Sequence, residues 1–300
     1  TVYPCGKRPN ASTVNYAPSQ TVPNAVIATV SGDGTVCLYT YKTTHLIVDV
    51  SGWFPDGAYQ PLDSPQRVLD TRPGEATADG KGEGAGLRPA MSVTEVPVKG
   101  RVGLPSDVQA VVLNVTVTQP QGAGFVTVYP CGGEPPNASN INYLPGRNVP
   151  NMVVSKVGAG SKVCLYTYAA AHLIVDVSGS LPEATFVPLG TPARLLDTRA
   201  GNDTVDGNYR GWGTQPWNGS LEMKVTGRGD IPADASAVVL NVTAVAPSGA
   251  GFVTVHPRGS KLPNASNVNY GPGDVVANAV VARVGRGGRI CLYNYAPTDV

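Results

Sequence analysis

Residues 110–130 read AVVLNVTVTQPQGAGFVTVYP, and residues 237–257 repeat them almost unchanged as AVVLNVTAVAPSGAGFVTVHP. In the first copy Val111, Leu113, Val115 and Val117 alternate with Val112, Asn114 and Thr116. Successive side chains of a β-strand point to opposite faces, so this alternation predicts an antiparallel strand that is half-buried, with one apolar face. We interpret residues 45–50, HLIVDV, as another strand of this kind.

The repetition extends along the whole chain with a period of 127 residues. PNASTVNY at 9–16 recurs as PNASNINY at 136–143 and PNASNVNY at 263–270, and VCLYTYKTTHLIVDVSGWFP at 36–55 recurs at 163–182. Solenoid repeats have periods of about 20–50 residues, so this period indicates a whole domain copied in tandem. We expect the C-terminal part of a first β-module at 1–58 (module 1), a complete second β-module at 59–185 (module 2) and a third at 186–300 that lacks its last strand (module 3). Both chain ends fall inside the repeat, which suggests a segment of a longer, processed chain.

The composition favours a β protein with many turns. The chain has 36 Gly and 27 Pro, only 14% of its residues are charged, and no stretch shows sustained helical periodicity. Clusters of Gly, Pro and Asn divide each module into about eight short strands, a spacing typical of sandwiches and barrels. We therefore predict an all-β fold of tandem antiparallel β-sandwich modules with jelly-roll-like topology and a 127-residue repeat. A closed barrel is the alternative.

Several classes of function are disfavoured. With 22 basic and 21 acidic residues the chain has no basic excess for nucleic acid, and no apolar run is long enough for a membrane span. No phosphate-binding loop, HExxH or GxSxG motif occurs. We interpret His45 and His172 as surface residues at a strand edge, Asp70 and Arg72 as a mutual pair, and Asp176 as an acceptor for loop backbone. The prediction is a protein without catalytic residues, metal or cofactor.

The five cysteines recur at two positions of the repeat. Cys5 and Cys37 are 32 residues apart, and Cys131 and Cys164 are 33 apart, in the same motifs. One pair per module predicts a structural disulfide, which on the chain-entropy model stabilises each module by roughly 3–4 kcal/mol. Arg258 replaces the partner of Cys291, which we therefore expect to be an unpaired thiol, buried beside tyrosines. Persistent disulfides indicate an oxidising, extracellular setting.

Asparagines recur with the fold, and several form Asn-x-Ser/Thr sequons. Possible glycosylation sites are Asn10, Asn114, Asn137, Asn241 and Asn264; Asn114 and its copy Asn241 should lie on the outer strand face, where a glycan has room. Asn24, Asn151 and Asn278 repeat as well, without a sequon. Asparagine readily bonds nearby backbone, so we favour an architectural role for this set over a sugar-attachment role.

One loop differs between modules. DGKGEGAGLRPAMS at 79–92 becomes DGNYRGWGTQPWNGS at 206–220, which gains Tyr209, Trp212 and Trp217. Exposed aromatic rings can stack on sugars or pack against a neighbouring module. Both interpretations remain open, as a glycan platform or as a module contact.

The combined motifs LDTR, AVVLNVT, GAGFVTVYPCG, PNASN and HLIVDVSG resemble a β-module found in tandem in large secreted and cell-surface proteins of actinobacteria. The similarity extends over the whole chain. It implies an extracellular protein, arrays of modules and no assigned catalytic residues. The chain departs from the pattern at Arg258 in place of Cys and at Asp299 in place of His.

Two functional hypotheses follow. The first is a non-enzymatic structural repeat protein of an extracellular stalk, surface filament or adhesin shaft. The second is a carbohydrate-binding module that recognises cell-wall or environmental glycan. Expected partners are neighbouring copies of the chain or further repeats of a longer chain, with a glycan as another. Missing strands would be supplied covalently or by a neighbouring chain, and both routes predict an open line of modules whose contacts do not close.

Overall fold

The computed structural model describes residues 1–18, 20–50, 52–183 and 185–300. Module 2 is a complete domain of strands. Its described residues form β3 (Gln60–Asp70), β4 (Ser92–Pro97), β5 (Ala110–Thr118), β6 (Gly124–Pro130), β7 (Ile141–Tyr143), β8 (Val149–Lys156), β9 (Lys162–Thr167) and β10 (His172–Leu181), with a 3₁₀ turn η1 (Ala159–Ser161) before β9.

These strands form two antiparallel sheets in the orders β3-β10-β5-β8 and β4-β9-β6-β7. Numbered within the module, the orders are 1-8-3-6 and 2-7-4-5, which is the double Greek key of a jelly roll. The prediction of a jelly-roll-like sandwich is confirmed. The barrel alternative is wrong, because two separate sheets face each other.

The core of module 2 lies between its two sheets. Val111, Leu113, Val115 and Val117 of β5 belong to it, as their alternation predicts. However, the other face of β5 is also buried: Val112 is 1% exposed and Asn114 is 8% exposed. The expectation of a half-buried strand is therefore wrong for β5, since residues of module 1 cover its outer face.

Module 3 repeats most of this architecture. Its described strands are β11 (Gly219–Lys224), β12 (Ala237–Val245), β13 (Gly251–Pro257), β14 (Val268–Tyr270), β15 (Val275–Arg283) and β16 (Arg289–Asn294), with a 3₁₀ turn η2 (Arg286–Gly288) before β16. They form the sheets β11-β16-β13-β14 and β12-β15 around a second core. Within this described part, residues 187–196 are not in a strand although they align with β3, because β3 pairs only with β10 and the sequence ends as the equivalent of β10 begins.

Module 1 contributes a short antiparallel pair, β1 (Val2–Pro4) and β2 (Val36–Leu38). Residues 45–50, predicted to be a half-buried strand, are irregular and exposed; Ile47 is 85% exposed. The same sequence forms β10 in module 2, where β3 and β5 flank it. Residues 1–58 contain no copies of those two neighbours, so the pattern alone does not produce a strand.

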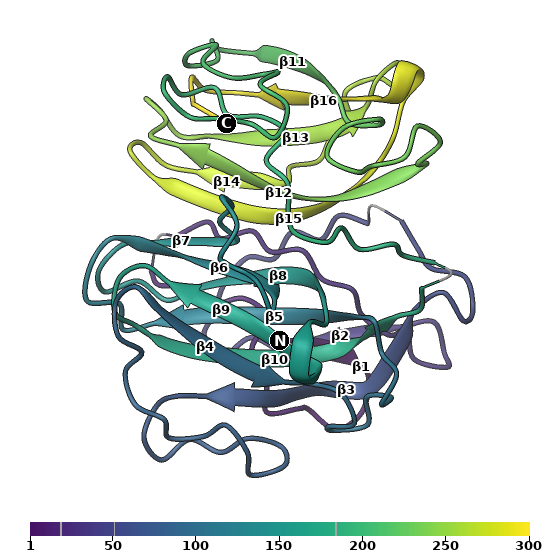
Figure 1. The fold of residues 1–300 in the computed structure, drawn as a ribbon, viewed down its shortest axis with the longest axis vertical. Coiled ribbons are helices and arrows are strands. Elements are labelled where there is room, and N and C mark those ends of the chain that lie inside the picture. The colour runs from purple at the N-terminus through teal and green to yellow at the C-terminus, as the bar shows by residue number, and fades with distance from the viewer. Residues whose placement is uncertain (19, 51, 184) are drawn as a thin grey trace.

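The modules do not follow one another in an open line. In Figure 1 module 3, green to yellow, lies above module 2, and part of the purple N-terminal segment lies between them. Module 1 bonds both other modules: Asn24 accepts a hydrogen bond from Met152, and Ala25 donates one to Asn278. The expectation of contacts that do not close is wrong for these modules, because the third contacts the first.

Candidate functional site: a repeated asparagine junction and an aromatic loop

The junction between modules 1 and 2 is built on the edge strand β8. The backbone N–H of Met152 donates to Oδ1 of Asn24 at 2.9 Å, while Nδ2 of Asn24 donates to the carbonyl oxygen of Thr13 and to Oδ1 of Asn114, at 2.6 and 2.8 Å. Nδ2 of Asn114 in turn donates to the carbonyl oxygen of Ser12 at 2.5 Å. One side-chain amide thus caps a free strand edge, the part of a sheet that otherwise pairs with other chains.

The junction between modules 2 and 3 has the same geometry, shifted by one repeat. Oδ1 of Asn151 accepts the N–H of Ala279 on the edge strand β15 at 3.0 Å, and its Nδ2 donates to Oδ1 of Asn241 at 2.9 Å. Between modules 3 and 1, Oδ1 of Asn278 accepts the N–H of Ala25, also at 3.0 Å. The expected bonds from this asparagine set to loop backbone are confirmed, but the contacts between modules were not foreseen.

The first two copies of the repeated PNAS motif lie at these junctions. Ser12 and its copy Ser139 offer carbonyl oxygens to Asn114 and Asn241, the latter at 2.6 Å. The side-chain amide nitrogen of Asn114 and of Asn241, which would carry a glycan, therefore already donates a hydrogen bond to a residue of another module. The expectation of room for a glycan at Asn114 is wrong, because its side chain is buried.

The other three predicted glycosylation positions differ from these strand residues. Asn10, Asn137 and Asn264 are the asparagines of the three PNAS copies, and all three are exposed. Their use as glycosylation sites stays a prediction.

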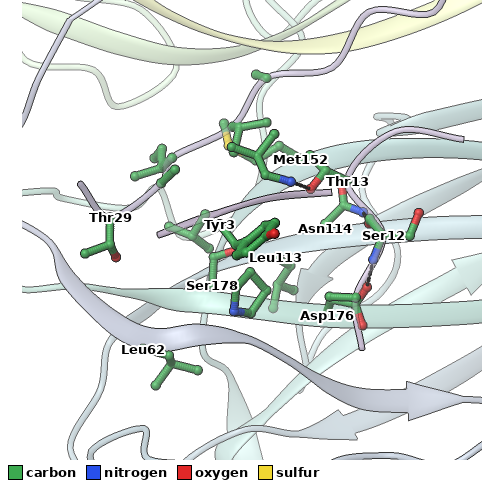
Figure 2. Close-up of a pocket in the computed structure, with 18 of the residues that line it drawn as sticks. Tyr3, Ser12, Thr13, Thr29, Leu62, Leu113, Asn114, Met152, Asp176 and Ser178 are labelled. Atoms are coloured by element: carbon green, nitrogen blue, oxygen red, sulfur yellow. Dashed lines mark hydrogen bonds between the residues drawn. The ribbon is translucent and has the colours of Figure 1, made fainter. Parts of the chain in front are cut away.

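A buried ion pair supports the first junction. Asp176 accepts the N–H of Ser12 at 3.2 Å and a bond from Nε of Arg67 at 2.9 Å, and Arg67 also bonds Asp70 at 3.1 Å. Figure 2 shows Ser12 directed at Asp176 from the module 1 side. Burial raises the pKa of Asp176, while the guanidinium and the N–H act in the opposite direction. The predicted role of Asp176 as an acceptor for loop backbone is confirmed.

A cavity lies beside this contact. It measures about 30 Å³ and is lined from both modules, among others by Tyr3, Ile27, Asn114, Met152 and Asp176 (Figure 2). Small-molecule sites occupy about 300–1,000 Å³, whereas one water needs roughly 10–15 Å³ in this measure. The cavity therefore has room for two or three waters and not for a sugar ring.

Neither a metal cluster nor a membrane helix occurs in the described residues. No group of three or more His, Cys, Asp or Glu side chains there could hold a metal ion. The described part of the chain also contains no helix long and apolar enough to cross a membrane.

The LDTR motif is structural in its contacts. Nη2 of Arg72 lies 2.7 Å from Oδ2 of Asp70, which confirms the predicted pair. His172 is buried and its Nδ1 lies 3.0 Å from Oγ1 of Thr71, so the prediction of a surface histidine is wrong at this position. Its module 3 counterpart Asp299 accepts a bond from the equivalent threonine at 2.7 Å, which explains how the substitution keeps the contact.

The cysteines pair as the spacing predicts. Cys5–Cys37 and Cys131–Cys164 are disulfides, with Cα atoms 4.9 and 5.0 Å apart. Cys291 is buried and unpaired in the described part of the chain. Two disulfides are compatible with an oxidising, extracellular location.

Cys291 on β16 lies in a row of side chains that crosses three strands of the sheet. In the sheet register it stands between Glu222 on β11 and His256 on β13. Arg258 occupies the position of Cys131 and forms an ion pair with Glu222 at 2.6 Å. Desolvation and the nearby carboxylate raise the pKa of the thiol, so it is not an activated nucleophile.

The aromatic loop of module 3 forms two groups of rings. Trp217 meets Tyr295 edge-on at 5.7 Å between centroids, and Tyr295 stacks on Phe252 at 5.5 Å. Tyr209 and Trp212 form the other group at 5.1 Å. Trp212 and Trp217 are each 55% exposed, and the partners of both rings lie in module 3.

Tyr209 is held in place by its surroundings. Its hydroxyl accepts bonds from the N–H of Lys224 and from Arg289, both at 3.1 Å, and Arg228 lies 4.6 Å above its ring. Arg228 is itself buried and bonded to Asp206 at 2.7 Å, so the Arg-Gly-Asp tripeptide at 228–230 is not presented as a free ligand. Of the three predicted platform residues, only the two tryptophans offer an open ring.

Sequence reasoning missed that one face of β5 and β12 contacts another module. The available signal was an asparagine amid valines, Asn114 and its copy Asn241, on the face assigned to solvent. A polar residue that recurs on an otherwise apolar strand indicates a specific partner rather than bulk water.

The comparisons with known proteins identify no family. No family model matches the chain, and no curated protein matches it. Among solved structures, the tandem CBM22-1–CBM22-2 domain of Xyn10C from Paenibacillus barcinonensis has 12% identity, covers 78% of this chain and 90% of that chain, and gives a TM-score of 0.23. The oxalate decarboxylase of Bacillus subtilis has 13% identity, with coverage of 71% and 76% and a TM-score of 0.14. Neither similarity is close enough to support a functional assignment.

Proposed function

We propose that the chain is a non-enzymatic structural repeat protein of an extracellular stalk, surface filament or adhesin shaft. The observation that carries this proposal is the reuse of one asparagine contact at each module junction, by Asn24, Asn151 and Asn278. The recurring residues of the sequence are thus used to pack modules together. The two disulfides, and a junction cavity too small for a sugar ring, agree with a structural role.

The contact of module 3 with module 1 indicates which part of the protein would repeat along such a shaft. Its building block is a compact body of three modules rather than single modules in a row. Secretion, surface location and membership of the actinobacterial modules are part of the same proposal.

Immunogold electron microscopy of the producing cells, with antibodies against residues 59–185, tests this role. Label on surface fibres or stalks is expected. Label confined to the cell interior, or to dispersed single particles in the medium, would contradict it.

A second candidate function is glycan binding by module 3. It is favoured by Trp217 and Tyr295, whose rings are 55% and 45% exposed and adjoin each other. Aromatic faces of this kind are suitable for stacking on sugar rings. Module 2 has the equivalent Tyr168, with Ala90 in place of the tryptophan.

A matched pair of variants tests this candidate on a glycan array. Trp217→Ala should abolish binding without lowering the melting temperature, and Ala90→Trp should add a second platform beside Tyr168, because both positions are exposed. Binding that is unchanged by Trp217→Ala would reject a role for this ring.

A further inference from the structure

The junction asparagines form a closed cycle. Each of Asn24, Asn151 and Asn278 accepts a backbone N–H from the residue that follows the next asparagine of the set: Met152, Ala279 and Ala25 in turn. The three distances are 2.9, 3.0 and 3.0 Å. The last bond joins residues 253 positions apart in the sequence and returns the cycle to its start.

A cycle that returns after three steps defines a pseudo-threefold axis. Contacts between equivalent positions of different modules mark where it runs: Arg147 and Asp274, one repeat apart, approach within 3.5 Å. Met152 and Ala279 share one buried cluster, and Ala25 packs against it. The axis is therefore filled by one large and two small side chains at the same repeat position.

The contact is directional, because each module offers an asparagine side chain to one neighbour and the backbone N–H of the next residue to the other. A head-to-tail contact of this kind forms a ring when its rotation closes and a filament when it does not. Here it closes at three.

We infer that the repeat carries a threefold self-association surface, so that three modules close into a ring whether they belong to one chain or to separate copies. The partner is another module of the same type, bound through the asparagine of one and the edge strand β8 or β15 of the next. The inference rests on the proposed structural role and deepens it by naming the partner of each module surface.

Module 2 is suitable for testing this on its own. Its described strands pair into sheets only with one another, and every buried member of the core between its sheets lies between Val68 and Val177. It also contains its own disulfide, Cys131–Cys164. Residues 59–185 therefore include a complete jelly roll that contains both partners of the contact, the accepting Oδ1 of Asn151 and the donating N–H of Met152 on β8.

The first experiment measures the mass of isolated residues 59–185 by size-exclusion chromatography with light scattering over a range of concentrations. We expect a mass three times that of one module. Because three methionines would meet at the axis, Met152→Ala is measured in parallel, and a trimer of either form supports the inference. Folded, disulfide-bonded monomers of both forms at all concentrations would overturn it.

Matched charged variants identify the surface. Asn114→Arg places a long cation where the neighbouring Ser139 and Asn151 should bind, so it should give a folded monomer. Val93→Arg introduces the same side chain on the exposed face of β4, in the other sheet, and should remain trimeric. Loss of the trimer in both variants, or in neither, would contradict the proposed surface.

The full chain provides a second measurement that does not depend on the isolated module. A closed arrangement of 300 residues should scatter X-rays with a radius of gyration of about 19 Å, the value for a compact body of this length. Asn114→Arg combined with Asn241→Arg should open the ring and enlarge that radius. An extended wild-type chain whose radius these changes leave unaltered would overturn the inference. The proposed shaft function is tested separately by microscopy, so either can fail without the other.

Discussion

Arginine at position 258 replaces a cysteine that module 2 uses in a disulfide, and restoring it tests how closely the modules correspond. The backbone around Arg258 repeats that around Cys131. The carbonyl of Cys131 accepts the N–H of Ala159 at 2.7 Å, and the carbonyl of Arg258 accepts the N–H of Arg286 at 3.0 Å. In Arg258→Cys the new thiol should therefore form a disulfide with Cys291.

The size of the effect follows from the loop that would be closed. The equivalent pair in module 2 has a sequence separation of 33 residues, which corresponds to about 3.7 kcal/mol on the chain-entropy model. The substitution also removes the ion pair of Arg258 with Glu222, whose side chains are 42% and 45% exposed. Exposed pairs contribute about 0.2–1 kcal/mol, so the free energy of unfolding of module 3 should rise by about 3 kcal/mol.

The assay combines disulfide mapping of unreduced peptides with melting in the presence and absence of reductant. We expect a peptide in which position 258 is disulfide-linked to Cys291, and a melting temperature raised by roughly 10 °C that is lost on reduction. Arg258→Ser is the control, because it removes the ion pair without adding a thiol. Two alkylatable thiols under oxidising conditions would refute the claimed correspondence, as would a melting temperature no higher than that of Arg258→Ser.

Three further predictions concern the interior and pH. Met152→Ala removes the large side chain at the module axis and should lower the free energy of unfolding by about 2–5 kcal/mol in urea denaturation; a change below about 1 kcal/mol would mean that the axis is not packed. A Cβ on Gly158 would lie 2.2 Å from the backbone of Cys131, whereas a Cβ on Gly133 would meet open space. Gly158→Ala should therefore lower the melting temperature far more than Gly133→Ala, and equal effects would contradict this close approach. Hydrogen bonding from Arg228 lowers the pKa of Asp206 below its ordinary value of about 3.9, so its contribution to stability is present above that pH and is lost as the pH falls towards its lowered folded-state pKa. Asp206→Asn should weaken this acid dependence in pH-resolved melting, and an unchanged profile would exclude the pair as its source.

The sequence by itself determined the fold class, the repeat and the disulfides, since all three follow from residue patterns along a strand or between copies of the repeat. Alternation along residues 111–117 fixes which side chains of β5 face the core, because the two-residue period is a property of the extended backbone. The pairs Cys5–Cys37 and Cys131–Cys164 follow from their recurrence in the same two motifs of successive copies, 32 and 33 residues apart. The turns between strands likewise follow from local Gly, Pro and Asn chemistry.

Only the tertiary structure decided what covers each outer strand face. HLIVDV is buried as part of β10 in module 2 and exposed at 45–50 in module 1, although the letters are the same. The difference lies in the neighbouring strands, because an extended segment is stable only when its backbone groups find partners. Asn114 was likewise assigned to solvent, because its sequence neighbourhood does not reveal Ser12 and Asn24, about 100 and 90 residues away. Closure of the three modules rests on contacts separated by up to 253 residues, and no local pattern in the chain encodes a contact at that range.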